Sequence, residues 1–311
     1  MTENALELSI EERKERSERI KAICVLQRGA LLLRLEQEEA WDLHAKLDTC
    51  GEKTSLTCTG CGSNHPIETR CKRRWCPTCA RKISFDRVAK YERRLQHLTW
   101  PLWVTLTIKN SDDETIIDEL KAGWKKFRRK KIMLDHCKGG LWALEVTEIG
   151  NGWHPHIHAM LDCKWLAHAT PAPVPCDDKN TLAEKIMYAK AELIEEWGSC
   201  VDQPYAIAQA KRKNGSAAAR ELLKYAVKGS DLLESSLPIA PLLRMIDAGR
   251  TISTFGSLRN GKLPPEKDDD KPKLACEHCG AESTWLPSEV ACRMGLASGH
   301  SVVKYADGGK K

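Results

Sequence analysis

Alternating apolar and polar positions mark the middle of the chain as strands. Leu102, Val104, Leu106 and Ile108 are separated by polar or amphipathic residues, which predicts a half-buried strand over 102–110. Two further strands are predicted at 141–147 and 153–161, on either side of a turn at Gly150-Asn-Gly152. Helical composition and spacing predict helices at 7–48, 82–97, 115–134, 181–198 and 216–228, with Thr181 and Ser216 as candidate N-caps. Helices and strands are therefore mixed along the chain.

Two stretches outside these segments are rich in cysteine, and the first, residues 50–79, has too few apolar residues to build a core of its own. Residues 50–79 are rich in Cys, Gly, Thr and Pro, and a second Cys/His segment at 276–300 follows a Pro/Lys/Asp linker at 261–273. We therefore predict an N-terminal helical segment at 1–48, a zinc-binding module at 49–82, a main domain at 83–262, and a linker with a Cys/His module at 263–311.

Composition and charge narrow the class of protein. The 311 residues are 41% hydrophobic, which is enough for a sizeable core, but no apolar run is long enough to span a membrane. Charged residues are scattered through the first thirty positions, unlike in a secretory signal, so we expect an intracellular, cytoplasmic protein without a membrane partner. The net charge of +6 permits nucleic-acid binding without requiring it.

Of the fourteen cysteines, six lie between Cys50 and Cys79 and three between Cys276 and Cys292, and such bunching in CxxC pairs is typical of metal binding. In a reducing compartment a disulfide framework is not expected. Four thiolates from two such pairs suit a closed, tetrahedral structural Zn²⁺ site. The predicted first zinc ligands are Cys58, Cys61, Cys76 and Cys79, with Cys71 as an alternative ligand and Cys50 and His65 as spares. The competing interpretation makes Cys50 and Cys71 reduced, buried thiols.

A second set has the ligand count for another structural zinc. It consists of Cys276, Cys279, Cys292 and His300, in which the last two are spaced more loosely. The competing interpretation is an unstructured tail with incidental cysteines.

The segment His154-Pro-His-Ile-His158 points to a second kind of metal chemistry. On a strand, His156 and His158 share one face and Ile157 faces the other, so two imidazoles can chelate one divalent ion. A two- or four-residue loop centred on Gly150-Asn151 would pair Glu145 with His156, and an Asn151-Gly152 loop would pair it with His158. Two imidazoles and a carboxylate with open positions suit Mg²⁺ or Mn²⁺ acting on a phosphate.

The loop length decides which carboxylate joins the histidines. A three-residue loop would place Glu148 rather than Glu145 on their face. We expect Glu145.

One predicted helix carries a tyrosine among charged residues. Glu221, Tyr225 and Lys228 are spaced i, i+4 and i+7, so they line one face. A tyrosine is a weak nucleophile unless a polarised phosphate and a nearby ammonium assist it. Alone, this motif would be an ordinary amphipathic helix with a salt-bridged tyrosine.

These motifs together resemble the HUH endonucleases, in particular the replication initiators (Rep proteins) of small rolling-circle plasmids. Three motifs occur in the family's order: the strand Leu106-Thr-Ile-Lys-Asn110, the histidine strand, and Tyr225-Ala-Val-Lys228. The stretch from Cys71 to Cys79 looks like the zinc module that precedes the nuclease domain in plasmid Rep proteins and related transposases. The resemblance covers roughly residues 55–260.

The resemblance implies an α+β fold whose nuclease domain has a central antiparallel sheet of RRM/ferredoxin-like topology, flanked by helices. It implies that His156 and His158 hold the divalent metal and that Tyr225 is the single catalytic tyrosine, because Tyr188 and Tyr205 are not at helical spacing from it. Tyr225 would nick single-stranded or hairpin origin DNA, leaving a 5′-phosphotyrosine and a 3′-OH primer for a host helicase and polymerase. Lys228 would assist at the phosphate, and Glu221 would activate the water that ends the cycle.

Two other functions stay open. The first is an HUH-type transposase, because it uses the same chemistry; a conjugative relaxase is disfavoured, since its tyrosine usually precedes the histidines. The second is a non-catalytic, zinc-containing nucleic-acid-binding protein. Candidate DNA contacts are basic residues, each with a plain solvated surface as the alternative: Lys125, Lys126, Arg128, Arg129, Lys211, Arg212 and Lys213.

Overall fold

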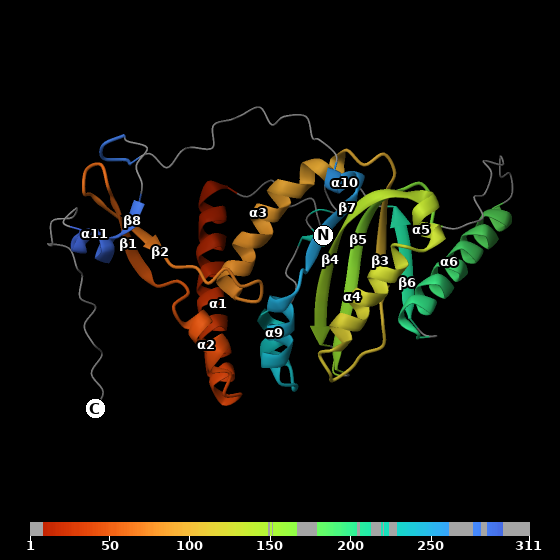
Figure 1. Cartoon of the computed structure of the whole chain (residues 1–311), viewed down its shortest axis with the longest axis horizontal. Coiled ribbons are helices and arrows are strands. Elements are labelled where there is room, and N and C mark those ends of the chain that lie inside the picture. Colours follow the sequence, from red (N-terminus) through yellow and green to blue (C-terminus); the bar gives the residue numbers. More distant parts are fainter. Residues whose placement is uncertain are drawn as a thin grey trace. The chain divides into compact units, whose positions relative to one another are not determined.

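Five antiparallel strands form the central sheet of the computed structural model, in the order β6-β3-β5-β4-β7 (Figure 1). Four of them are joined through the helices α4 and α6 in the order and arrangement of a split β-α-β motif. The sheet flanked by helices confirms the expected α+β class. The strands are β3 (Pro101–Thr107), β4 (Cys137–Glu148), β5 (Trp153–Cys163), β6 (Ile207–Arg212) and β7 (Ile252–Gly256).

The structure describes residues 9–148, 150, 152–166, 179–203, 206–212, 219, 221–223, 229–260, 276–280 and 285–294. These residues fall into two units, Met1–Asp48 with Cys71–Lys262, and Thr49–Arg70 with Leu263–Lys311. The zinc module predicted at 49–82 is thus divided between the two units. None of the described helices is both long and apolar enough to cross a membrane.

One face of the sheet is covered by two helices, α4 (Ile116–Phe127) and α6 (Lys179–Val201), which run side by side (Figure 1). We call this the helix face. The Trp124 ring lies 6.3 Å from that of Trp142 on β4, and Phe127 meets Trp197 of α6 edge to face at 5.8 Å. The indole N–H of Trp197 donates to the carbonyl of Thr107 at 2.8 Å. Large aromatic side chains therefore bind both helices to the sheet.

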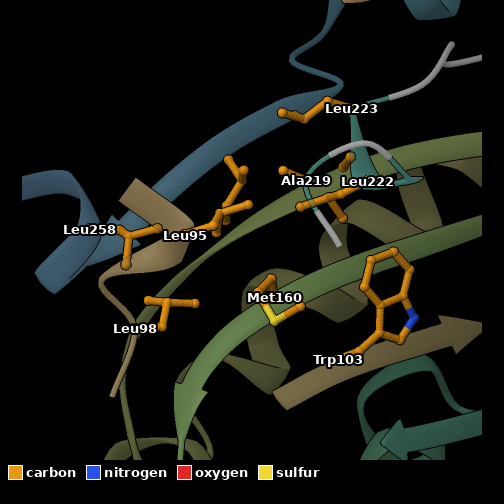
Figure 2. Packing of buried hydrophobic residues seen from close by; sticks show 10 residues of the cluster. Leu95, Leu98, Trp103, Met160, Ala219, Leu222, Leu223 and Leu258 are labelled. Carbon is orange, nitrogen blue, oxygen red and sulfur yellow. The ribbon is translucent and has the colours of Figure 1, made fainter. Parts of the chain in front are cut away.

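The opposite face carries the histidines of β5, and the described residues of one hydrophobic cluster cover one end of it. We call it the histidine face. There Trp103, Leu141 and Met160 pack against Leu95 of α3 (Pro77–Gln96) and Leu258 of α10 (Ser257–Asn260). The same cluster includes three residues of the short described segment before position 224, which Figure 2 shows over the strands: Ala219, Leu222 and Leu223. The histidines of β5 lie on this face outside the hydrophobic cluster.

The expected helix at 7–48 is found as α1 (Ile10–Gln37) and α2 (Trp41–Asp48). Ser9 caps α1 in a reciprocal capping box with Glu12. At the other end, the Glu38 carboxylate accepts hydrogen bonds from the backbone N–H groups of Ile239 and Ala240, at 2.9 and 2.8 Å. These are the first residues of α9 (Ile239–Ala248), which follows α8 (Gly229–Glu234). Glu38 thus caps a helix 200 residues away in sequence.

Several local predictions need correction. The helix expected over 115–134 is interrupted, because the backbone at Lys130 is extended, and α5 (Lys131–His136) follows as a separate turn. Thr181 is not an N-cap, since α6 begins at Lys179. The strands β6 and β7 were not predicted, because each is short and lies at an edge of the sheet.

The second unit contains a small sheet of its own in the order β2-β1-β8, all antiparallel. This sheet joins strands from residues 53–68 to a strand at residues 285–287. Its elements are β1 (Lys53–Cys58), β2 (Asn64–Glu68), β8 (Trp285–Pro287) and α11 (Ser288–Arg293).

Candidate active site and metal-binding clusters

Three histidines form a row on the histidine face of β5. His154, His156 and His158 are half-buried and alternate with fully buried residues, among them Ile157, as expected. Glu145 of β4 is paired directly with His156, which is the register expected for a two- or four-residue loop centred on Gly150-Asn151. Directly opposed residues share a face, so Glu145 joins the row.

His158 has a polar partner on each ring nitrogen. Its Nδ1 lies 3.1 Å from Thr105 Oγ1, and its Nε2 lies 3.0 Å from Glu145 Oε2. The indole N–H of Trp103 donates to the same Thr105 hydroxyl at 2.9 Å. A threonine hydroxyl can donate one hydrogen bond and accept two, so Thr105 either donates to Nδ1, with Nε2–H donating to Glu145, or accepts from Nδ1–H. In the second tautomer the Nε2 lone pair faces the carboxylate, and a proton or a cation must lie between these two acceptors.

The spacing of these two acceptors suits a metal. Ligand atoms of an octahedral ion with bonds of about 2.1 Å lie about 3.0 Å apart. The separation between His158 Nε2 and Glu145 Oε2 is 3.0 Å. Thr105 and Trp103 would then orient the ligating ring from behind, as outer partners of metal-bound histidines do.

His156 is a neutral imidazole with an unsatisfied nitrogen. Burial, reinforced by the neighbouring His154 and His158, lowers the pKa of His156 to about 4. Its buried Nδ1 has no hydrogen-bond partner among the described residues, and its Nε2 lies 3.5 Å from Thr147 Oγ1. An imidazole that is neutral at pH 7 keeps a lone pair for a metal.

His154 is engaged elsewhere, since its Nδ1 is hydrogen-bonded to Asn110 Oδ1. The His156 and His158 rings lie parallel, 15° apart in plane, with centroids 5.7 Å apart. In the part of the chain that the structure describes, only cysteines bring three or more ligand atoms within 4.8 Å of one another. The ring of His156 must therefore turn to share one ion with His158 and Glu145.

The tyrosine motif is described only in its first part. Tyr225 and Lys228 lie outside the described residues, and Glu221 is exposed. Leu222 and Leu223 are buried on the histidine face (Figure 2), and Ser84 Oγ of α3 donates to the Leu223 carbonyl at 2.7 Å. The chain is therefore fixed on the histidine face two residues before Tyr225.

The candidate DNA contacts divide between the two faces of the sheet. Lys125, Lys126 and Arg129 are exposed at the end of α4, on the helix face. The Arg128 guanidinium instead lies over the rings of Trp124 and Phe255, at 5.6 and 5.3 Å, so it takes part in packing.

Lys211 lies on the other side. It is exposed on β6 and paired with Trp103, so it points to the histidine face. Arg212 ends the same strand, and Lys213 lies outside the described residues. Of these cations, Lys211 is thus the one whose described side chain shares a face with the histidines.

One group of cysteines lies at the start of α3. Cys76 is the N-cap residue of this helix, and Cys71 Sγ lies 3.7 Å from Cys79 Sγ. The Cys76 sulfur atom lies within 4.8 Å of both. Hydrogen bonds to Cys71 and Cys79, together with burial, raise the pKa of Cys76, so a cation would be needed to hold these groups as thiolates. This group can hold a metal ion.

The other group combines Cys58 and Cys61 with Cys276 and Cys279, again within 4.8 Å. It too can hold a metal ion. A hydrogen bond with Ser63 and bonds from backbone amides lower the pKa of Cys276 to about 5, which favours its thiolate.

The cysteine groups differ from the predicted ligand sets. The CxxC pairs at 58–61 and 76–79, predicted to form one site, belong to different groups, and Cys71 joins the second pair. Cys276 and Cys279 group with Cys58 and Cys61, whereas the prediction grouped them with Cys292 and His300. The side chain of Cys292 and the whole of His300 lie outside the described residues. Spacing identifies CxxC pairs, but strand pairing between distant segments decides which pairs meet.

Sequence reasoning missed Thr105 and Trp103 as partners of His158. Both occupy the polar or amphipathic positions of the predicted strand at 102–110, so the alternation already placed them on one face. What the alternation did not indicate is that this strand lies next to β5.

A protein-family model matches part of the chain. Residues 67–165 match the Rep_1 family, which is described as a replication protein. The matched segment includes Cys71–Cys79, β3, β4 and β5, and thus Glu145 and the histidine row, and it ends before the tyrosine motif. Searches of curated proteins and of solved structures gave no significant match. The resemblance to replication initiators is thus confirmed over this segment.

Proposed function

We propose that this protein, whose central segment is that of a replication protein, initiates rolling-circle replication of a plasmid by nicking and rejoining single-stranded origin DNA through Tyr225. The observation that carries the proposal is the shared face of the sheet. His156, His158 and Glu145 lie there, and the chain leading to Tyr225 is anchored there by Leu222 and Leu223. A nucleophile and a metal-binding group that act on one phosphate must share such a surface.

The topology supports an HUH-type nuclease domain. In the family that the sequence resembles, the histidine pair lies on a central strand of an antiparallel RRM-like sheet. Here the histidine row lies on β5, the middle strand of five, within a split β-α-β arrangement.

His158 and Glu145 would hold a divalent cation, with His156 as the third ligand. Mg²⁺ or Mn²⁺ at this position would orient the scissile phosphate and withdraw charge from it. Thr105 would keep the His158 ring oriented, and the depressed pKa of His156 would keep its imidazole available at neutral pH.

The proposed reaction is a phosphoryl transfer to Tyr225. The phenol loses its proton as its oxygen bonds to phosphorus, and the O3′ oxygen gains a proton as its bond to phosphorus breaks. The 5′ end of the strand stays attached as a phosphotyrosine, and the free 3′-OH primes synthesis by a host polymerase behind a host helicase. The ammonium of Lys228 would stabilise charge on the phosphate, and Glu221 would activate the water that ends the cycle.

The cysteine group at the start of α3 would have a structural role. Cysteine thiolates are typical ligands of structural Zn²⁺ sites. We therefore propose that Cys71, Cys76 and Cys79 contribute ligands to a zinc ion.

A cleavage assay tests the nuclease proposal. The purified protein would be mixed with single-stranded origin DNA from its replicon and with Mn²⁺ or Mg²⁺, and a covalent protein–DNA adduct would be detected on a denaturing gel. We expect the adduct with the wild type and with Tyr188→Phe, a matched control on α6, but not with Tyr225→Phe. Chelation should abolish the adduct, and Mn²⁺ added afterwards should restore it at unchanged zinc content.

Two outcomes would contradict the proposal. An adduct that persists in Tyr225→Phe would mean that another residue is the nucleophile. Binding of the DNA without any adduct would instead favour the non-catalytic, zinc-containing binding protein.

A further inference from the structure

We infer that Cys58, Cys61, Cys276 and Cys279 bind one Zn²⁺ ion, and that this ion closes a zinc ribbon assembled from two distant segments of the chain. The two segments, residues 49–70 and 263–311, together form the second unit. This inference concerns the second unit alone and does not depend on the proposed nuclease activity.

The two CxxC turns have the same backbone geometry. The N–H of Gly62 donates to the carbonyl of Cys58 at 2.8 Å, and the N–H of Gly280 donates to the carbonyl of Cys276 at 2.8 Å. Both glycines have positive φ angles, +72° and +66°, which glycine adopts without strain. Each turn thus brings its two thiols to one side of the backbone, as the paired knuckles of a tetrahedral zinc site do.

The sulfur positions agree with a tetrahedron. Zn–S bonds of about 2.3 Å give a tetrahedron whose edges are about 3.8 Å long. Across the two turns, Cys58 Sγ lies 3.8 Å from Cys279 Sγ, and Cys61 Sγ lies 3.7 Å from Cys276 Sγ. A disulfide would need about 2.0 Å, so the thiols are arranged around a common centre and not in bonded pairs.

Neighbouring groups support the thiolates and fix the two segments. Ser63 Oγ and His65 Nε2 each lie 3.4 Å from Cys276 Sγ, as outer partners of a metal ligand. Trp285 is paired with Cys58 in the β1–β8 ladder, and its ring meets that of His65 edge to face at 4.6 Å. The strand after the second turn is therefore in register with the strand that leads into the first.

The described residues of the second unit bury little apolar surface that could hold it together without metal. Among its described residues, the buried ones are three cysteines, one threonine and one alanine: Cys50, Cys58, Cys276, Thr57 and Ala291. So little apolar burial cannot offset the entropy lost on ordering the chain. Zinc binding would supply the missing folding free energy, as in other small metal-dependent modules.

Zinc stoichiometry in paired variants tests this assignment. We expect Cys58→Ser/Cys61→Ser and Cys276→Ser/Cys279→Ser each to lose one zinc per chain, and the quadruple variant to lose that same single zinc. Cys24→Ser, on α1 and outside both groups, is the control and should lose none. Cys292→Ser/His300→Ala should also keep its full zinc content.

The alternative pairing gives a different result. If each CxxC pair belonged to a separate site, the quadruple variant would lose two zincs, and Cys292→Ser/His300→Ala would lose one. Either result would overturn the inference.

A second measurement needs no folded variant. In the wild-type protein, stepwise zinc release with a chelator should expose Cys58, Cys61, Cys276 and Cys279 to alkylation in one step, detected by mass spectrometry. Protection of Cys292 together with Cys276, while Cys58 reacts early, would refute the assignment. Failure of the nuclease assay would leave both zinc measurements unaffected, so the two proposals can fail separately.

Discussion

His158 depends on a hydroxyl group behind its ring. Thr105 Oγ1 accepts from Trp103 and lies 3.1 Å from His158 Nδ1, so it links a buried indole to the imidazole that faces Glu145. Such outer partners set the tautomer and the orientation of a metal-ligating histidine. Thr105 therefore belongs to the candidate site although it need not touch a metal or DNA.

Replacing Thr105 by valine keeps the shape of the side chain and removes this hydrogen bond. We expect the Mn²⁺ concentration needed for half-maximal cleavage to rise about 10–100-fold in Thr105→Val. Thr254→Val on β7 is the matched control and should leave it unchanged. An unaltered metal requirement in Thr105→Val would show that the hydroxyl does not orient the ring.

The lowered pKa of His156 makes a direct prediction. In the metal-free protein its imidazole should titrate at a pH of about 4, which NMR of the ring protons measures. The folded pKa is lower than the unfolded value of about 6.5, so protonation favours the unfolded state. The contribution of His156 to stability should thus decline as the pH falls from about 6.5 to 4. A measured value near 6.5 would contradict the burial of this ring.

At the scale of elements, the two faces of the sheet have different roles: one packs against helices and the other carries the candidate site. The helix face is covered by α4 and α6 through large aromatic side chains, whereas the histidine face is covered at one end by α3 and the segment around Leu222. Packing on the helix face thus fixes the strands, and the histidine face carries the polar groups of the candidate site. The catalytic proposal depends on this division.

The close approach of α4 and α6 requires a glycine. A Cβ at Gly123 would lie 2.2 Å from Val201 Cγ1 and 3.1 Å from the Trp197 ring. We expect Gly123→Ala to destabilise the protein by about 1–3 kcal/mol, because the two helices must move apart. The thermal unfolding midpoint measures this effect.

Gly29 on α1 provides the matched control, because a Cβ there meets nothing within 4 Å. Gly29→Ala should stabilise the protein by about 0.5–1 kcal/mol through helix propensity alone. Equal effects of the two substitutions would mean that α4 and α6 do not pack as closely as described.

At the scale of the whole molecule, the described cations predict which side binds DNA. Lys211 lies on the histidine face, and Lys125 lies on the helix face. We expect Lys211→Ala to weaken single-stranded DNA binding and to lower the slope of log K against log salt by about 0.7, the contribution of one phosphate contact. Lys125→Ala should change neither the affinity for single-stranded DNA nor the salt slope. A stronger loss of DNA affinity in Lys125→Ala than in Lys211→Ala would indicate that the DNA binds on the helix face.

The sequence alone determined the local geometry around the histidines. Alternation predicted the strands found as β3, β4 and β5, and a short turn between the last two limited their register, so Glu145 could be placed on the histidine face. The prediction succeeded because strand periodicity and turn length act over a few residues. The match of this same segment to replication proteins agrees with the resemblance that those motifs carried.

Only the tertiary structure decided which distant groups meet. Cys58 and Cys276 share a group because β1 pairs with β8, more than 200 residues later in the chain. Glu145 stands opposite His156 in register but contacts His158, because side chains reach diagonally across the strands. The cover of the histidine face by α3 and Leu222 follows from hydrophobic burial, which is non-directional and has no fixed spacing along the sequence.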